Sequence, residues 1–167
     1  MSSQYGAIGT NPLRDLDTTV EHLICEFLKA NYDPVLVGVP LNKVLWEQWG
    51  IPTGEYSIYF QDVGDFDMST EISWSIQDID HFTEIHIFVK SLHDDYARSG
   101  ARSLFYFQQW IKKVMREQKT ALADEGIMVM EYRDARIIPP ESDKDDIRRI
   151  VITVRTKIML INNATLI

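Results

Sequence analysis

Residues 146–161 read DIRRIVITVRTKIMLI, and this stretch decides the fold. Its evenly spaced apolar residues are Ile150, Ile152, Val154, Ile158 and Leu160. A period of two predicts a β-strand with one buried face. Residues 127–138 predict a second strand, and the charged segment between the two strands, with Pro139 and Pro140, predicts a turn. The two strands should therefore form a long hairpin.

Two stretches with a period near 3.6 predict long amphipathic helices. The first has an N-cap at Asp17 or Thr18 and ends before Asp33-Pro34, because the residue preceding a proline is disfavoured in a helix. The second spans 101–123, with Gly126 as its C-terminal cap. The buried stripes are Val20, Leu23, Ile24, Phe27 and Leu28 in the first, and Leu104, Phe107, Trp110, Ile111, Val114 and Met115 in the second.

Between the two helices the sequence predicts short strands. These are 35–39, 55–60, 71–76 and 82–90, the last two forming a hairpin through 77–81, with a loop at 62–69. Residues 41–54 fit a short helix, through the spacing of Leu41, Val44, Leu45 and Trp49. The expected fold is α+β, a mainly antiparallel sheet with two long helices packed on one face.

A chain of 167 residues with 45% hydrophobic residues is the size of one domain. We expect a flexible N-terminal arm at 1–16, a single domain at 17–162 and a C-terminal tail at 163–167. No signal peptide is expected, and no apolar run has the length of a membrane span. The single cysteine, Cys25, excludes an internal disulfide and is expected to be an inert packing residue.

The formal net charge of −8, with a pI near 4.9, argues against a protein whose main task is to hold nucleic acid. It is compatible with a protein that lets DNA pass without specific binding.

The sequence contains no motif typical of an enzyme. GxGxxG, GxxxxGK[ST] and GxSxG are all missing, so we expect no catalytic residue, cofactor or metal. His81 and His86, and the acidic residues near them, fit exposed strand and loop positions. The best enzyme alternative is a small metal-dependent nuclease using Asp78, Asp80 and Glu84. This alternative is weakened because residue 88, two before Lys90, is a phenylalanine where such nucleases carry an acid.

The order of elements resembles the tail-terminator, or tail-completion, proteins of tailed bacteriophages and related viruses. The resemblance covers about residues 18 to 161: an amphipathic helix, an apolar strand, a hairpin, a long second helix and a last hairpin. It implies a structural protein of the virion neck, assembled in the host cytoplasm. Such a protein forms a homo-oligomeric ring, a hexamer by resemblance, that ends the tail tube and joins it to the head-proximal connector.

The N-terminal arm and the stretch Leu41 to Ser69 depart from the family pattern, so another head–tail connector or a minor tail component fits nearly as well. A cytoplasmic ligand-binding domain is a third hypothesis.

If the chain forms such a ring, its surplus apolar and edge-forming residues are the expected contacts. The expected subunit or partner contacts are Trp46, Trp49, Arg155, Lys157, Leu166 and Ile167. The acidic side chains expected to face the channel or solvent are Asp62, Asp65, Asp67, Glu141, Asp143 and Asp145. Negative charge lining a channel would keep DNA from adhering.

Overall fold

The computed structural model describes residues 20–47, 55–67, 76–90, 100–139 and 147–161. Within them, one five-stranded sheet has the order β1-β2-β3-β5-β4. The helices are α1 (Val20–Ala30), α2 (Pro34–Val37) and α3 (Gly100–Glu117), with 3-10 turns η3 (Leu41–Lys43) and η5 (Ala123–Glu125). The strands are β1 (Val44–Glu47), β2 (Tyr56–Asp67), β3 (Ile76–Lys90), β4 (Ile127–Ile138) and β5 (Ile147–Ile161).

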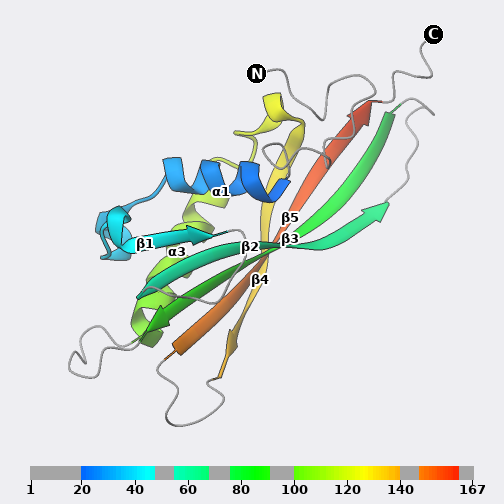
Figure 1. Cartoon of the computed structure of the whole chain (residues 1–167). Helices are drawn as coiled ribbons and strands as arrows, with labels where there is room; N and C mark the ends of the chain where they lie inside the picture. Colours follow the sequence, from blue (N-terminus) through cyan, green and yellow to red (C-terminus); the bar gives the residue numbers. More distant parts are fainter. Residues whose placement is uncertain (1–19, 48–54, 68–75, 91–99, 140–146, 162–167) are drawn as a thin grey trace.

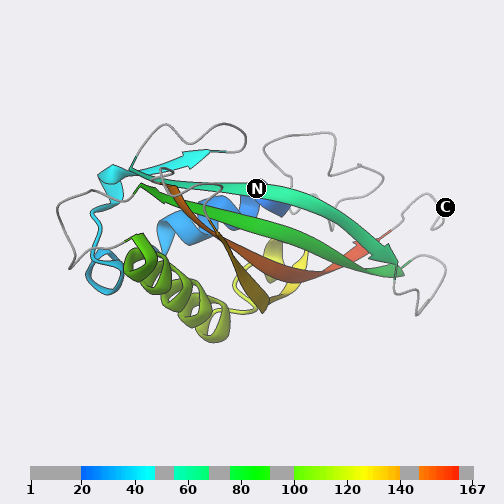
Figure 2. The same cartoon turned by 90° about the horizontal axis from the view of Figure 1, so that it is seen from below.

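The predicted fold class is confirmed. Both long helices lie on the same face of the sheet (Figure 1). Strands β2, β3, β5 and β4 pair antiparallel in that order, while β1 pairs parallel with β2. The β4–β5 hairpin is formed as predicted. Figure 2 shows the end of β2, the start of β3 and the end of β5 extending beyond the helices.

The core lies between the helices and this face of the sheet. The predicted stripe of α3 is buried throughout, no member being more than 6% exposed. In α1, Leu23 is partly buried and the rest of the stripe is buried. Opposite them, the sheet presents Ile85, Ile87 and Val89 from β3 and Ile150, Ile152 and Val154 from β5. Burying each such side chain stabilises the fold by about 1.5–3 kcal/mol.

Residues 35–39 are not a strand, which corrects one prediction. Pro34 to Val37 form the short helix α2. The Asp33 side chain caps it by accepting hydrogen bonds from the main-chain N–H groups of Val35 and Leu36, and Pro34 stands at the first turn, where its missing N–H costs nothing. Gly38, at a φ of 77°, ends the helix. The hydrogen bonds that cap α2 therefore outweigh the tendency of this apolar run to form a strand.

Residues 41–47 also differ from the predicted short helix. Leu41 to Lys43 form one 3-10 turn, and β1 then pairs with β2 through the Val44–Tyr56 register. Val44 is buried and Leu45 exposed, so a period of two applies here. Residues 48–54 lie outside the described residues.

The segments predicted as a loop at 62–69 and a connection at 77–81 are largely strand. Strand β2 continues to Asp67, with a bulge between Asp62 and Gly64, and β3 is continuous from Ile76. Gly64 has a φ of 124°, which a residue with a side chain rarely adopts. The predicted hairpin is therefore replaced by a longer β2–β3 pair. Residues 68–75, which include Ile72 and Trp74, lie outside the described residues.

Helix α3 ends at Glu117, six residues before the predicted end. The chain then turns, and Gly126, at a φ of 90°, caps η5. Among the described residues, no helix combines the length and the apolar character needed to cross a membrane.

Candidate functional site

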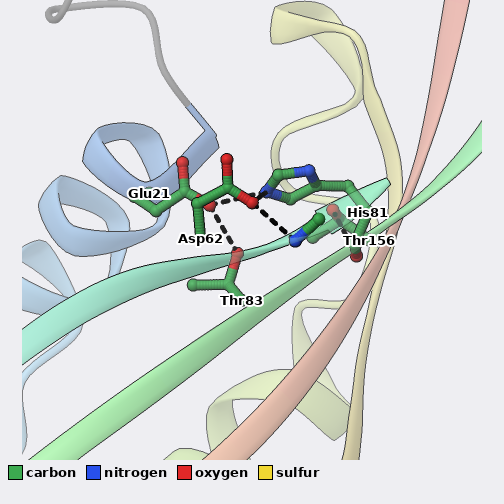
Figure 3. A network of polar contacts seen from close by, with 6 residues as sticks. Glu21, Asp62, His81, Thr83 and Thr156 are labelled. Atoms are coloured by element: carbon green, nitrogen blue, oxygen red, sulfur yellow. Dashed lines mark hydrogen bonds and ion pairs between the residues drawn. The ribbon is translucent and has the colours of Figure 1, made fainter. Parts of the chain in front are cut away.

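A cluster of polar side chains lies between α1 and the sheet (Figure 3). Glu21 comes from the first turn of α1, Asp62 from β2 and His81 from β3. One ligand-type atom of each lies within 4.8 Å of the others. No other group of three histidine, cysteine, aspartate or glutamate side chains in the described part of the chain converges in this way.

His81 and Glu21 form the buried centre of this cluster. His81 Nε2 lies 2.5 Å from Glu21 Oε1, and the Thr83 hydroxyl donates to the same oxygen at 3.0 Å. The His81 side chain is 1% exposed and that of Glu21 is 12% exposed. The Thr156 hydroxyl on β5 donates to the main-chain carbonyl of His81 at 3.3 Å. The cluster thus joins α1 to the middle of the sheet.

Asp62 lies on the open side of the cluster. Its side chain is 54% exposed, and its Oδ1 lies 3.8 Å from His81 Nε2. The same oxygen accepts a hydrogen bond of 2.7 Å from the main-chain N–H of Gly64. The β2 bulge therefore holds the Asp62 carboxylate in place.

Two opposing influences act on the pKa of Glu21. Burial is the largest single influence and raises the pKa. The hydrogen bond from His81, the charge of His81 and the hydrogen bond from the Thr83 hydroxyl lower it, and the pKa lies below its ordinary value. The carboxylate is therefore ionised at neutral pH. An imidazole and two carboxylates in this arrangement can link the helix to the sheet by hydrogen bonds, and they are also ligands of a divalent cation.

A second polar group lies on the opposite face of the sheet. The His86 ring stacks on Tyr59, with ring centroids 4.4 Å apart. Its Nε2 lies 3.1 Å from Glu84 Oε2, and its Nδ1 lies 2.6 Å from an Arg149 guanidinium nitrogen. Because arginine can only donate, Nδ1 accepts and the ring is neutral, with its proton on Nε2. Burial, and then the Arg149 charge, lower the pKa of His86.

The residues of the nuclease alternative do not assemble a metal site in the described part of the chain. Asp80 Oδ2 lies 3.7 Å from Arg155, and Glu84 pairs with Arg136 at 3.0 Å. Each carboxylate thus faces an arginine of its own. Asp78 lies on β3, four residues before Phe82.

The structure places some of the predicted contact residues. Trp46 on β1 packs edge-to-face against Tyr32 and Trp110, at centroid distances of 6.1 and 6.2 Å, and is partly buried. Arg155 on β5 bonds Glu131 at 2.7 Å, and Lys157 is opposite Asp80 in register.

Asp62, Asp65 and Asp67 lie on strand β2. Trp49, Glu141, Asp143, Asp145, Leu166 and Ile167 lie outside the described residues.

Cys25 behaves as the sequence suggested. It is buried, and burial raises the pKa of its thiol to about 11. The reactive thiolate is therefore rare at neutral pH.

A basic groove lies between α3 and β4 and was not predicted. It encloses about 340 Å³. The residues that line it are Lys112, Met115, Arg116, Lys119, Met130, Glu131, Tyr132 and Arg133. Lys112 lies over the Tyr132 ring, 5.0 Å from its centroid. Four cations thus gather at one place on an acidic chain.

Comparison with solved structures found chains that resemble this one in fold. No family model and no curated protein matches the chain. A chain of a solved structure described as "Virion of native gene transfer agent (GTA) particle" superposes with a TM-score of 0.48 and 13% identity, covering 80% of this chain and 90% of that chain.

Proposed function

We propose that this protein is a structural component of a tailed virion that works by assembly and not by catalysis. In this proposal identical subunits form a ring that ends the tail tube and joins it to the head-proximal connector. The observation that carries the proposal is the separation of charge on the surface: a basic groove on a chain with a net charge of −8.

A ring of identical subunits needs two different surfaces that fit each other, because each contact is head-to-tail. The α3–β4 groove supplies one such surface. With the four cations and Glu131 of the groove set aside, 13 basic residues remain against 24 acidic ones, a formal charge of −11. A neighbouring copy therefore offers the groove complementary charge, and charge of this kind fixes the register of an interface.

Strand β4 adds a second feature that favours association. It is the last strand of the described sheet, and at Met130 its main-chain N–H bonds the carbonyl of Lys119. Further along the same strand, Ile137 is 70% exposed. An apolar side chain on a long edge strand is a common site for pairing with another chain.

The other contacts belong to the same proposal. Trp46 and Trp49, Arg155 and Lys157, and the terminal Leu166 and Ile167 contact a neighbouring subunit or partner. The acidic residues Asp62, Asp65, Asp67, Glu141, Asp143 and Asp145 face the channel or solvent, so DNA passes without specific binding. The tube protein and the connector are the partners that the family resemblance implies. A hexameric ring follows from the same resemblance.

The deciding experiment removes the gene from the virus and examines the particles by electron microscopy. We expect filled heads and unjoined tails of irregular length, with joining restored when purified protein is added. Labelled protein should form a ring at the head-proximal end of the tail. Label at the distal tip, or normal joining without the protein, would overturn the neck position. A ring on the connector alone would instead identify the other head–tail connector role.

A further inference from the structure

We propose that Glu21, Asp62 and His81 form a binding site for a divalent transition-metal ion, of the class of Zn²⁺ or Co²⁺. The inference concerns this cluster alone and is independent of the virion role.

The first argument is geometric. His81 Nε2 lies 2.5 Å from Glu21 Oε1 and 3.8 Å from Asp62 Oδ1, and all three atoms lie within 4.8 Å of one another. Ligand atoms about 2.0–2.2 Å from one ion lie about 3–3.5 Å apart in a tetrahedral or octahedral shell. The distance from His81 Nε2 to Glu21 is shorter than this range and the distance to Asp62 is longer. Small side-chain movements would therefore bring all three atoms onto one ion.

The second argument is electrostatic. Aspartate and glutamate carry negative charge at neutral pH, and two such groups facing one imidazole nitrogen repel each other. The nitrogen carries at most one hydrogen, and Glu21 is its hydrogen-bond partner. Asp62, at 3.8 Å, lies beyond hydrogen-bond distance. A divalent cation between the three groups would contact both carboxylates, which a single proton does not.

The third argument is the support given to each carboxylate. The Thr83 hydroxyl bonds Glu21, and the Gly64 main-chain N–H bonds Asp62. Groups that orient ligands in this way are a regular feature of metal sites. Asp62 is 54% exposed while His81 is buried, so an ion can enter from the Asp62 side and keep water on its remaining positions.

The mixture of one nitrogen and two oxygen ligands sets the class of ion. Imidazole suits zinc and its transition-metal neighbours, whereas magnesium, calcium and manganese prefer oxygen ligands. On binding, the ion would replace the proton that His81 Nε2 shares with Glu21, and that proton would pass to solvent. The ion would then link α1 to β2 and β3.

The test uses the full chain after dialysis against EDTA. We expect one Zn²⁺ per chain in isothermal titration calorimetry and visible absorption from one bound Co²⁺, with no comparable heat from Mg²⁺. The melting temperature should rise with Zn²⁺, because the ion binds only the folded chain. Asp62→Asn, at an exposed position, should weaken Zn²⁺ binding roughly tenfold or more, in the range found when metal-site residues are changed.

The matched control is Asp134→Asn, which removes an exposed carboxylate from β4, away from this cluster. It should bind Zn²⁺ as the unmodified chain does. His81→Gln, checked for folding by circular dichroism, should abolish the Co²⁺ absorption. No saturable binding of Zn²⁺ or Co²⁺ would overturn the inference. Unchanged binding in Asp62→Asn, or an equal loss in Asp134→Asn, would also overturn it.

Discussion

Trp110 of α3 donates its indole N–H to the main-chain carbonyl of Asn31, 3.0 Å away, at the end of α1. The same ring is fully buried and meets Tyr32 edge-to-face, with centroids 5.1 Å apart. Tyr32 in turn donates its hydroxyl to the carbonyl of Val39 at 2.7 Å. One side chain therefore holds together the two long helices and the chain that leads into the sheet.

We predict that Trp110→Ala lowers the free energy of unfolding by about 3–5 kcal/mol, the usual cost of removing a buried tryptophan. Denaturant titration followed by circular dichroism gives this value. Phe105→Ala is the control on the same helix, because Phe105 is 53% exposed. It should cost less than about 1 kcal/mol. A similarly small cost for Trp110→Ala would show that the ring does not form part of the core.

Long periodic elements could be predicted from the sequence, whereas short ones could not. The α3 stripe and strand β5 repeat their pattern over three or more periods, so the pattern alone identifies them. The segment from Pro34 to Val37 is four residues long, and its helix depends on the Asp33 cap and on Gly38. The extension of β2 through Asp62 depends on a bulge, and on pairing with β3, that no local pattern specifies.

The candidate site could not be predicted from the sequence for a similar reason. Glu21 and His81 are 60 residues apart, and neither belongs to a spaced motif. In the sequence Glu21 is only an acid in the first turn of a helix, which the helix dipole explains. The strand pattern places Glu84 and His86 on one face, as the structure shows, because that relation is local.

We predict that lowering the pH destabilises the folded chain in part through His86. The pKa of His86 is lower in the folded chain than the ordinary value of about 6.5, because of burial and the Arg149 charge. As the pH falls, the unfolded chain therefore takes up this proton first. The contribution is complete above about pH 6.5 and is lost as the pH falls toward the folded-state pKa.

The groups that face His86 are Glu84 on β3, Arg149 on β5, Arg136 on β4 and Tyr59 on β2. Comparing the pH dependence of unfolding in the unmodified chain and in His86→Gln isolates the histidine. The variant should lose stability less steeply between pH 7 and 5. Equal slopes in the two proteins would contradict the assignment.

We predict that the chain does not cut DNA. Purified protein with Mg²⁺ or Mn²⁺ should leave supercoiled plasmid intact, because Asp80 and Glu84 each face an arginine and do not converge on an ion. The control is a triple variant, Asp78→Asn with Asp80→Asn and Glu84→Gln, prepared in the same way. Metal-dependent nicking that the triple variant lacks would establish the nuclease alternative.

We predict that the C-terminal residues take part in joining heads to tails. Removal of residues 164–167 together with Trp49→Ser should reduce joining in a mixture of purified heads and tails. Trp46 is left unchanged, because its contacts with Tyr32 and Trp110 would make a substitution destabilising. A melting temperature equal to that of the unmodified chain would separate lost contacts from lost folding. Normal joining by this variant would refute the contact assignment.

The basic groove leads to the sharpest assembly prediction. Lys112→Glu with Arg133→Glu reverses two cations of the groove, so a neighbouring acidic surface should be repelled and joining should fall roughly tenfold or more, as like charges in contact cost several kcal/mol. Lys29→Glu with Lys43→Glu makes the same change in net charge at exposed positions on α1 and η3. This control should join heads and tails normally.

Raised salt should weaken joining by the unmodified chain, because screening shortens the reach of the charges. An equal loss in both double variants would mean that net charge matters and the groove does not. Retention of DNA by the unmodified chain, lost only in the groove variant, would assign the groove to nucleic acid instead of a second subunit.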